Sequence, residues 1–500
     1  MTRRSLDIAT LMSRSGVKFG TSGARGLVAD MTDAVCHAFA TAFLRAVAPE
    51  APVVVIGHDL RPSSPGIAAA CAAAVRDEGR RIVYAGALPT PALAHHGARI
   101  GAPVIVITGS HIPFDRNGIK FYGTDGEITK DDEQRMAATV VELQTHPRLE
   151  TLGPPDPAAR ESYVARYVDF LGAGALDGTV VAVHEHSSVA RDVLPEILER
   201  LGARVLRGGR TDTFVPIDTE AVRDEDVALA RERASRERFD AIVSTDGDAD
   251  RPLIGDESGS WLRGDAVGTL CARWLGVDVV VTPVSSNSAV ERCGAFGRVV
   301  RTRIGSPHVI AGMRMAAAAG RTVGVAGYEA NGGFLLGSAA ERAGRRLEAL
   351  ETRDAVLPIL ALLCAARERR APLSALVATL PARHTASDRL QAFPSADGAA
   401  LVARLAADRP ALGALLAPAC GPVVAVDLTD GVRATFASGD IVHLRPSGNA
   451  PELRCYAEAD SAEHAARLCG EALARVAAGG GAADTTPPGG TDRRHAETMA

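Results

Sequence analysis

A unit of one Val-rich strand, one helix and two further strands recurs three times along this chain. The last strand of each unit leads into a loop of polar residues. Short apolar strands that alternate with helical segments predict a mostly parallel sheet, and the ligands of such a sheet lie beyond the carboxyl ends of its strands. We therefore expect three consecutive mixed, mostly parallel α/β domains with functional loops at matching positions. The strands are expected at Val53–Ile56, Arg81–Tyr84 and Val104–Ile107 in the first unit, at Val180–Val183, Arg204–Leu206 and Ala241–Val243 in the second, and at Val279–Val281, Arg298–Val300 and Thr322–Val325 in the third.

The last part of the chain shows a different pattern, which predicts a smaller C-terminal α+β domain. We predict domains over residues 1–154, 155–265, 266–375 and 376–477. Residues 478–500 contain much Gly, Pro, Thr and Ala and are expected to form a disordered tail. The elements expected in the last domain are an antiparallel meander of Val423–Leu428, Arg433–Phe436 and Ile441–Leu444, a strand at Leu453–Ala457 and a helix over Ala462–Val476.

The composition narrows the class of protein. A chain of 500 residues is too long for one core. Its formal net charge of −5 argues against a large basic face, so no nucleic-acid partner is expected. No apolar run is long enough to span a bilayer, and the eight scattered cysteines indicate reduced thiols. We expect a soluble cytoplasmic protein, a monomer or a homodimer, with no membrane partner.

The first polar loop, Thr108-Gly109-Ser110-His111, supplies a hydroxyl at the end of an apolar strand. A serine there can accept a phosphoryl group when a base and a cation lie nearby, although most strand-end serines only complete a turn. The turn at Asn117-Gly118 returns Lys120 toward the same strand end. A lysine close to phosphate can hold charge or relay a proton, which favours the catalytic interpretation of Ser110.

The second loop carries Asp246, Asp248 and Asp250, followed by Arg251. Three carboxylates that alternate with small residues on a tight loop can converge on one hard cation, and Mg²⁺ prefers such oxygen ligands. The alternative is a solvated acidic turn. The spacing does not fit an EF-hand, so we favour a magnesium site with room for a phosphate oxygen.

Two further loops suit a sugar phosphate. In Gly327–Gly333, glycines flank Glu329 and Asn331, and a carboxylate with an amide can hold adjacent sugar hydroxyls, unless the two residues only cap a turn. The loop Arg445–Asn449 offers a guanidinium, a hydroxyl and backbone N–H groups around a glycine, which suits a dianionic phosphate. Taken alone, the Ser-Gly-Asn sequence is an ordinary turn. The presence of a candidate seryl acceptor and a metal loop in the same chain favours phosphate binding.

Two other segments are weaker candidates. Phe19–Gly26 lacks the pattern G-x-x-x-x-G-K-[ST], so a nucleotide site is not expected, and Arg25 can instead serve as a cation for a phosphate. His184, Glu185 and His186 have the side chains of a metal cluster. Adjacent residues of a strand point apart, which argues against a metal role for them.

Together these loops resemble those of the α-D-phosphohexomutases, a family that includes phosphomannomutase, phosphoglucomutase and phosphoglucosamine mutase. The resemblance covers about residues 15–476, with every main loop in the family's order. Phe19–Gly26 matches the opening F-G-T-x-G-x-R-G, Thr108–Pro113 with Asn117–Lys120 the phosphoserine loop, Asp246–Arg251 the metal loop, Gly327–Gly333 the sugar-binding loop and Arg445–Pro451 the phosphate loop.

The resemblance implies four domains around a central cleft and the interconversion of hexose 6-phosphate and hexose 1-phosphate. Ser110 would carry the phosphoryl group, and hexose 1,6-bisphosphate would be the intermediate and activator. The implied metal ligands for Mg²⁺ are Ser110, Asp246, Asp248 and Asp250. The implied catalytic residues are Ser110, Lys120 as general base, Arg25, His111 and Arg251; the substrate-binding residues are Glu329, Asn331 and His308; and the phosphate-binding residues are Arg445, Ser447, Gly448, Asn449 and Arg454.

Some loops depart from the family pattern, which bears on the preferred sugar more than on the reaction type. Asn331 stands where serine is common, Asn449-Ala450 where Thr-Glu is common, and Gly305–His308 differs from several members. We expect mannose as the main sugar and glucose as a second, with phosphoglucomutase and phosphoglucosamine mutase as alternatives. From other classes, the alternatives are a metal-dependent sugar-phosphate phosphatase and a catalytically silent binding protein. The loop order and Lys120 favour the mutase.

Overall fold

The computed structural model describes residues 4–20, 22–149, 151–319, 324–447 and 451–479. These residues fall into two compact units, Met1–Arg383 and His384–Ala500. Gly448, Asn449 and all but the first two residues of the expected tail lie outside the described residues. In the described part of the chain, no helix combines the length and the apolar composition needed to cross a membrane.

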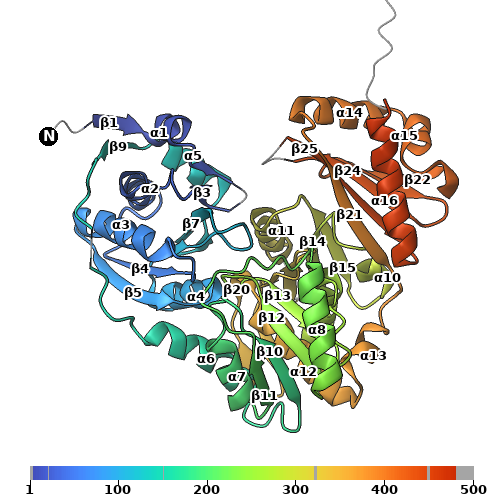
Figure 1. Ribbon diagram of the computed structural model, residues 1–500, viewed down its shortest axis with the longest axis horizontal. Coiled ribbons are helices and arrows are strands. Elements are labelled where there is room, and N and C mark those ends of the chain that lie inside the picture. Colours follow the sequence, from blue (N-terminus) through green and yellow to red (C-terminus); the bar gives the residue numbers. More distant parts are fainter. Residues whose placement is uncertain (1–3, 21, 150, 320–323, 448–450, 480–500) are drawn as a thin grey trace, which may run out of the picture. The chain divides into compact units, whose positions relative to one another are not determined.

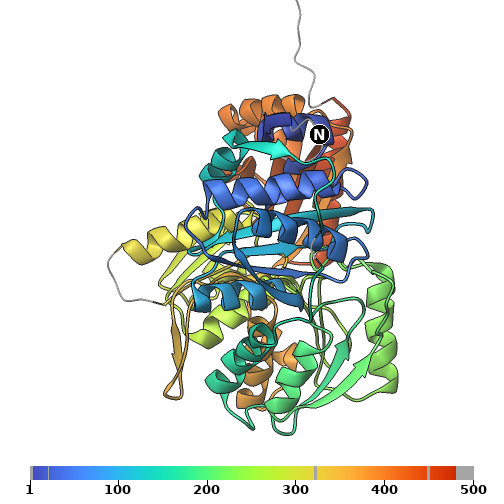
Figure 2. The same ribbon diagram turned by 90° about the vertical axis from the view of Figure 1, so that its left-hand side faces the viewer.

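The first α/β segment is a sheet with helices on both faces. The order of its main strands is β2-β3-β7-β6-β4-β5, where β4, β5 and β6 are parallel and the others pair antiparallel. Alternate residues of β4 contact different helices, because Val54 and Ile56 pack toward α2 and α3 whereas Val55 packs toward α4. The helices therefore sandwich the sheet, as Figure 1 shows and as Figure 2 shows from the side. The elements are β1 (Arg4–Asp7), α1 (Ile8–Ser15), β2 (Lys18–Phe19), β3 (Ala24–Leu27), α2 (Asp33–Ala46), β4 (Val53–His58), α3 (Ser64–Asp77), β5 (Arg81–Ala87), α4 (Thr90–Ile100), β6 (Val104–Ile107), β7 (Arg116–Gly123), β8 (Gly126–Glu127), α5 (Lys130–Ala138) and β9 (Val140–Leu143).

The second and third segments repeat the central part of this design. Their sheets have the orders β11-β10-β12-β13 and β15-β14-β16-β17-β20. The same strand order occurs in all three sheets. The first strand of each unit lies between the second and the third strand and is parallel to both, and the strand beyond the third is antiparallel to it. The predicted repeat is confirmed. The elements are α6 (Ala158–Leu171), β10 (Val180–His184), α7 (Val193–Arg200), β11 (Arg204–Gly208), α8 (Asp224–Arg236), β12 (Ala241–Thr245), β13 (Pro252–Gly255), α9 (Gly264–Leu275), β14 (Val279–Pro283), α10 (Ala289–Arg292), β15 (Arg298–Thr302), α11 (Ser306–Ala318), β16 (Val325–Tyr328), β17 (Phe334–Leu336), β18 (Ala340–Arg342), β19 (Arg345–Leu347), β20 (Leu350–Asp354), α12 (Val356–Arg369) and α13 (Leu373–Val377).

One predicted strand extends further than expected. The third strand of the third segment was expected over Thr322–Val325; Thr322 and Val323 lie outside the described residues, and β16 runs from Val325 to Tyr328. Gly327 lies inside it, and a Cβ there would come within 2.4 Å of Val309 on α11. The glycine is thus required by close packing of helix on strand and does not end the strand.

The second unit is a five-stranded antiparallel sheet covered by helices. Its strand order is β21-β25-β24-β23-β22, and α16 (red in Figure 1) lies against β21 and β25. The predicted meander and final helix are confirmed, while β21, α14 and α15 were not predicted. The elements are β21 (His384–Gln391), α14 (Ser395–Ala407), α15 (Arg409–Leu416), the 3₁₀ helix η1 (Pro418–Cys420), β22 (Val423–Asp427), β23 (Val432–Phe436), β24 (Ile441–Pro446), β25 (Glu452–Ala459) and α16 (Ala462–Ala477).

Candidate active site

Ser110 stands three residues after the end of β6 and points at the aspartate loop. It is fully buried, and its backbone has a φ of 53°, a left-handed conformation that residues other than glycine rarely adopt. Its N–H donates to Thr108 Oγ1 at 2.8 Å, and its Oγ donates to Asp246 Oδ2 at 2.7 Å. His111 Nδ1 lies 3.3 Å from the same Oγ. The hydroxyl therefore contacts a carboxylate of another segment rather than only completing its own turn.

Arg61 holds the loop that carries Ser110, and sequence reasoning missed it. Its Nε donates to Asp59 Oδ2 at 3.2 Å, and this oxygen also accepts from the Gly109 N–H at 3.2 Å. A Cβ at position 109 would lie 2.5 Å from Arg61 Cζ, so glycine permits the contact. The only sequence signal is the position of Asp59 and Arg61 directly after β4. The guanidinium also donates to four backbone carbonyls, those of Ser110 (2.9 Å), Ile112 (2.5 Å), Pro113 (2.7 Å) and Arg116 (3.0 Å).

The three aspartates after β12 converge as the sequence predicted. One carboxylate oxygen of each lies within 4.8 Å of the others, and all three side chains are buried. Ala249 between them has a φ of 56°, a second left-handed residue in this region. Asp248 Oδ1 and Asp250 Oδ1 accept no hydrogen bond from any described residue, and Arg251 Nε lies 3.6 Å from Asp250 Oδ1. Two buried carboxylate oxygens without a hydrogen bond, beside a third aspartate, fit the donor set of a hard cation, so this loop can hold a metal ion.

Lys120 and Arg353 occupy the other side of these carboxylates. Lys120 Nζ donates to Oδ2 of Asp248 and Oδ2 of Asp250, each at 2.7 Å. Burial alone would lower the pKa of Lys120, but the two aspartates outweigh it and hold that pKa above its usual value. Arg353 on β20 donates to Asp250 Oδ2 from Nε and Nη2 and to Glu329 Oε2 from Nη1, at 2.7–3.0 Å. Arg353 was not predicted, because nothing near it in the sequence marks it.

The acidity of the aspartates reflects these contacts. Burial and the neighbouring Asp248 and Asp250 hold the pKa of Asp246 well above its usual value. Burial also raises the pKa of Asp250, but Arg353 and Lys120 outweigh it and bring that pKa below its usual value. The site therefore tolerates the buried negative charge through two fixed cations.

Arg25 and Arg251 act on His111, the residue next to Ser110. Burial and the nearby Arg251 and Arg353 lower the pKa of Arg25 to about 10. Arg251, together with burial and Arg25, lowers the pKa of His111 to about 2, so its imidazole is neutral. Nε of the buried Arg251 makes no hydrogen bond to a described residue. The guanidinium groups that lower the pKa of Arg25 and of His111 make the region beside Ser110 suited to an anion.

The residues expected to bind sugar are only partly brought together. Glu329 follows β16 and is buried in its ion pair with Arg353. Asn331 Oδ1 accepts from the Gly333 N–H at 3.0 Å, so part of this side chain serves its own turn. His308 lies in the first turn of α11, two residues after Ser306, which donates to Glu127 Oε2 at 3.3 Å. Ser22 of the Phe19–Gly26 segment donates to the other oxygen of Glu127.

The backbone at His184–His186 is not the extended strand that the sequence predicted. His186 has a φ of 28°, so the chain turns and the rings of His184 and His186 stack with centroids 5.6 Å apart. Glu185 instead forms ion pairs with Arg207 and Arg210, at 2.5 and 2.8 Å. The three side chains do not gather at one point.

In the second unit, three arginines form a row across neighbouring strands. Arg445 on β24 is the register partner of Arg454 on β25, which is the partner of Arg389 on β21. Arg445 therefore belongs to a strand rather than to the predicted loop. The Ser447 N–H donates to Glu452 O at 2.8 Å, directly after that strand. Glu452 forms ion pairs with Arg389 and Arg454, and Asp430 forms one with Arg445, at 3.3–3.4 Å. Two carboxylates beside three opposed arginines leave a row that suits an anion, and Arg389 is a member that the sequence did not indicate.

Comparison with known proteins decides the family. Models of the phosphoglucomutase/phosphomannomutase family match four stretches of the chain: alpha/beta/alpha domain I over residues 16–146, domain II over 161–259, domain III over 263–384 and the C-terminal domain over 391–475. The chain belongs to the phosphoglucomutase/phosphomannomutase family. The family resemblance, the fold class and the mutase type of enzyme predicted from the sequence are thereby confirmed.

Individual members of the family match most of the chain. It is 46% identical over 468 residues to a phosphomannomutase of Salmonella muenchen, covering 93% of this chain and 97% of that protein. It is 47% identical over 470 residues to a phosphomannomutase of Sinorhizobium fredii, covering 92% and 98%. The fold matches that of a phosphoglucomutase/phosphomannomutase family protein from Burkholderia thailandensis with a TM-score of 0.72 at 21% identity, covering 92% and 97%.

Proposed function

We propose that this family member is a phosphomannomutase that interconverts mannose 6-phosphate and mannose 1-phosphate through a phosphorylated Ser110. The observation that carries the proposal is the buried Ser110 hydroxyl, 2.7 Å from Asp246 in a triad with two buried carboxylate oxygens that accept no hydrogen bond from the described residues. The two relatives at 46% and 47% identity, both phosphomannomutases, support mannose as the sugar. Glucose is the second sugar that we expect.

Magnesium is the cofactor that the donor set favours. Asp246, Asp248 and Asp250 would hold it with a phosphate oxygen of Ser110, because Mg²⁺ prefers hard oxygen ligands. When bound, it would offset the charge of the phosphoserine, about −1.5 to −2 at neutral pH, and that of the transferring group. The Oδ1 atoms of Asp248 and Asp250 would face the cation, since Lys120 already occupies their Oδ2 atoms. Lys120 thus orients the carboxylates of Asp248 and Asp250 through the oxygens that would not bind the cation.

The cations around Ser110 would steady the transferring phosphoryl group. Arg25 and Arg251 offer guanidinium donors, and neutral His111 can donate or accept a hydrogen bond at the Ser110 oxygen. Lys120 is an ammonium in this arrangement, so it can donate a proton to the sugar oxygen that leaves. It is also the candidate general base, a role that its neutral form would perform and that a cation held by the aspartates would favour.

The remaining loops would bind the substrate. Glu329, neutralised by Arg353, can accept hydrogen bonds from sugar hydroxyls without an unpaired buried charge, and we assign Asn331 and His308 to the same sugar. The arginine row of Arg445, Arg454 and Arg389, with the loop Ser447–Asn449, would bind the phosphate that is not reacting. Hexose 1,6-bisphosphate is the intermediate: after Ser110 gives its phosphate to one end of the sugar, the molecule turns and the other phosphate returns to Ser110.

The test is a direct assay of three substrates. Mannose 1-phosphate, glucose 1-phosphate and glucosamine 1-phosphate are each supplied with Mg²⁺ and a trace of glucose 1,6-bisphosphate, and 6-phosphate and inorganic phosphate are measured. The proposal predicts fastest formation of mannose 6-phosphate, no phosphate release, and no activity in Ser110→Ala. Steady phosphate release without isomerisation would identify a phosphatase, and faster conversion of glucosamine 1-phosphate would overturn the choice of sugar.

A further inference from the structure

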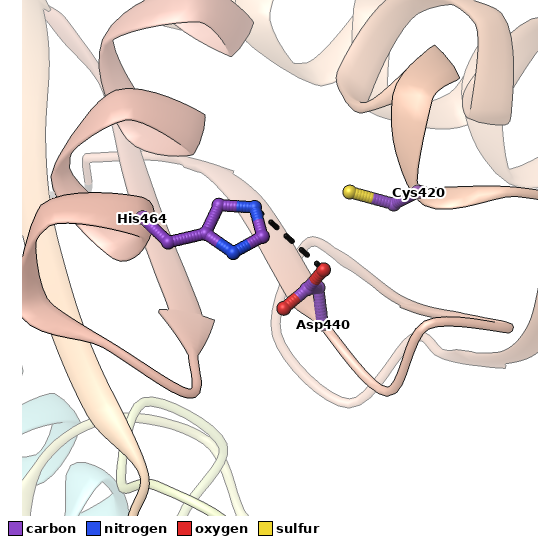
Figure 3. Close-up of side chains that lie close together, drawn as sticks. All are labelled: Cys420, Asp440 and His464. Carbon is purple, nitrogen blue, oxygen red and sulfur yellow. Dashed lines mark ion pairs between the residues drawn. The ribbon is translucent and has the colours of Figure 1, made fainter.

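A second group of candidate metal ligands lies in the second unit. Cys420 ends the 3₁₀ helix η1, Asp440 precedes β24, and His464 lies in the first turn of α16. Their Sγ, carboxylate oxygen and ring nitrogen all lie within 4.8 Å of one another. Figure 3 shows the three side chains pointing toward one another from three separate elements. We propose that Cys420, Asp440 and His464 bind a divalent cation of the zinc type, at a site separate from the aspartate triad.

The donor atoms distinguish this site from a magnesium site. One sulfur, one nitrogen and one oxygen suit Zn²⁺, whereas Mg²⁺ requires oxygen ligands. Ligands at about 2.0–2.3 Å from a tetrahedral zinc lie ~3.3–3.7 Å from one another. His464 Nε2 and Asp440 Oδ2 are already 3.8 Å apart, so closing the site needs side-chain adjustments of about 1 Å. Three protein ligands leave the fourth position to water, and the His464 side chain, 33% exposed, opens the group to solvent.

The backbone and a neighbouring hydroxyl hold this group in place. Ser438 Oγ donates to Asp440 Oδ2 at 2.7 Å and accepts from the Asp440 N–H at 3.2 Å. The Ser438 N–H donates to Cys420 O at 3.2 Å. One serine therefore ties two of the three ligand residues together and orients the carboxylate, which is the role of an outer-shell partner in metal sites.

A thiol nucleophile is the competing interpretation of Cys, His and Asp side by side. A catalytic cysteine needs a lowered pKa. The Asp440 carboxylate lies beside the Cys420 sulfur, and negative charge next to a thiol disfavours its thiolate. A bound cation would offset that charge and take the thiolate as a ligand, and the thiol proton would be released to solvent.

The site would stabilise the second unit rather than take part in phosphoryl transfer. Its ligands span residues 420 to 464 and join three elements, so a bound cation would bridge segments that otherwise separate on unfolding. Asp440 precedes the first residue of β24, whereas Arg445 is five residues further along, roughly 16 Å in an extended strand. The cation would therefore not contact the arginine row.

Cadmium titration of the full-length reduced protein, in buffer with saturating Mg²⁺, tests the proposal. Bound Cd²⁺ gives an ultraviolet thiolate-to-metal band that an oxygen-only site such as the triad cannot give. We expect one equivalent of Cd²⁺ to produce the band in the unchanged protein and in Cys293→Ser, a matched control at a half-buried cysteine outside the group. Cys420→Ser should abolish the band, and His464→Gln should weaken binding at least tenfold. With Zn²⁺, the melting temperature should rise by several degrees in the unchanged protein and in Cys293→Ser only.

Three outcomes would overturn the proposal. They are the absence of a band, a band that persists in Cys420→Ser, and a melting temperature that Zn²⁺ raises equally in Cys420→Ser. If Cys420→Ser fails to fold, His464→Gln decides, because a third of that side chain is exposed: unchanged cadmium affinity in that variant refutes the site. The band should persist in Asp246→Asn, because the triad has no sulfur ligand. Mutase activity without zinc should be the same in Cys420→Ser and Cys293→Ser, so failure of the proposed reaction would leave this test intact.

Discussion

Arg61 is the residue whose replacement probes most sharply how the fold places Ser110. All five N–H groups of its guanidinium are used, one on Asp59 and four on the carbonyls of Ser110, Ile112, Pro113 and Arg116. Arg61→Lys keeps the positive charge but has three donors, of which Asp59 takes one. At least two carbonyls then lose their partner in a buried site.

The cost follows from these lost contacts. Each buried carbonyl left unsatisfied costs about 1–3 kcal/mol, so the Ser110 loop should be destabilised by roughly 2–6 kcal/mol in its present conformation. The loop can relax by moving, and a displacement of ~1 Å at a reacting group costs about 100-fold in rate. We therefore expect kcat for mannose 1-phosphate to fall about 100-fold in Arg61→Lys, with KM nearly unchanged because the residues assigned to the sugar are not touched.

Arg80 provides a matched control in the same segment. Its guanidinium also donates to four backbone carbonyls, those of Leu44, Ala48, Pro49 and Ala51. None of these carbonyls belongs to the loop that carries Ser110. Arg80→Lys should lower the free energy of unfolding in urea, because partly buried carbonyls lose their partner. Its kcat should stay within about twofold of that of the unchanged protein, because the loop that carries Ser110 keeps its contacts. The reasoning is refuted if Arg61→Lys keeps kcat within threefold of the unchanged protein, or if both variants lose activity equally.

Three further predictions concern the metal site, the arginine row and the dependence of stability on pH. Asp248→Asn should abolish Mg²⁺-dependent turnover, and chelation of Mg²⁺ should do the same reversibly in the unchanged protein; activity of the variant in chelator would contradict this. Arg389→Ala should raise KM for the sugar phosphate about tenfold, the loss of one charge-assisted contact, while Arg467→Ala on the exposed side of α16 should not. Burial lowers the pKa of His443 to about 4, so the second unit should lose stability as the pH falls below the unfolded value of about 6.5, by ~2 kcal/mol at pH 5. Urea unfolding of His443→Gln should lack this pH dependence, and an equal slope in that variant would refute the assignment.

The sequence predicted the elements whose signal is local. Val-rich runs such as Val53–Ile56 and Ala241–Val243 became β4 and β12, because buried parallel strands are apolar throughout. Ser110 and the three aspartates were found because each follows the carboxyl end of such a strand, although β6 and β12 belong to different sheets. Ser110 and Asp246 meet across 136 residues.

The elements that were missed lack a local signal. Arg353 gains its role from Asp250 and Glu329, 103 and 24 residues away, and no pattern around it indicates this. β21, which carries Arg389, is an edge strand with mostly exposed polar residues, so it has none of the apolar alternation that marks a strand. Such residues are identified only when the tertiary contacts are known.

Backbone conformation accounts for the error at the histidines. The rule that neighbours point apart holds within a strand, but β10 ends at His184, and the left-handed His186 then turns its ring back onto that of His184. Positive φ at a residue other than glycine is not visible in a sequence. The same holds for Ser110 and Ala249, whose unusual backbone shapes the two central loops.

The most direct test of the central claim is to follow one phosphoryl group. The protein is incubated with Mg²⁺ and glucose 1,6-bisphosphate labelled in its phosphates, the peptide that contains Ser110 is analysed by mass spectrometry, and mannose 6-phosphate is then added. The account predicts one phosphoryl group on Ser110, lost to the added sugar as a labelled bisphosphate and absent in Ser110→Ala. A phosphoryl group on another residue, or its loss to water with no labelled sugar, would contradict the account.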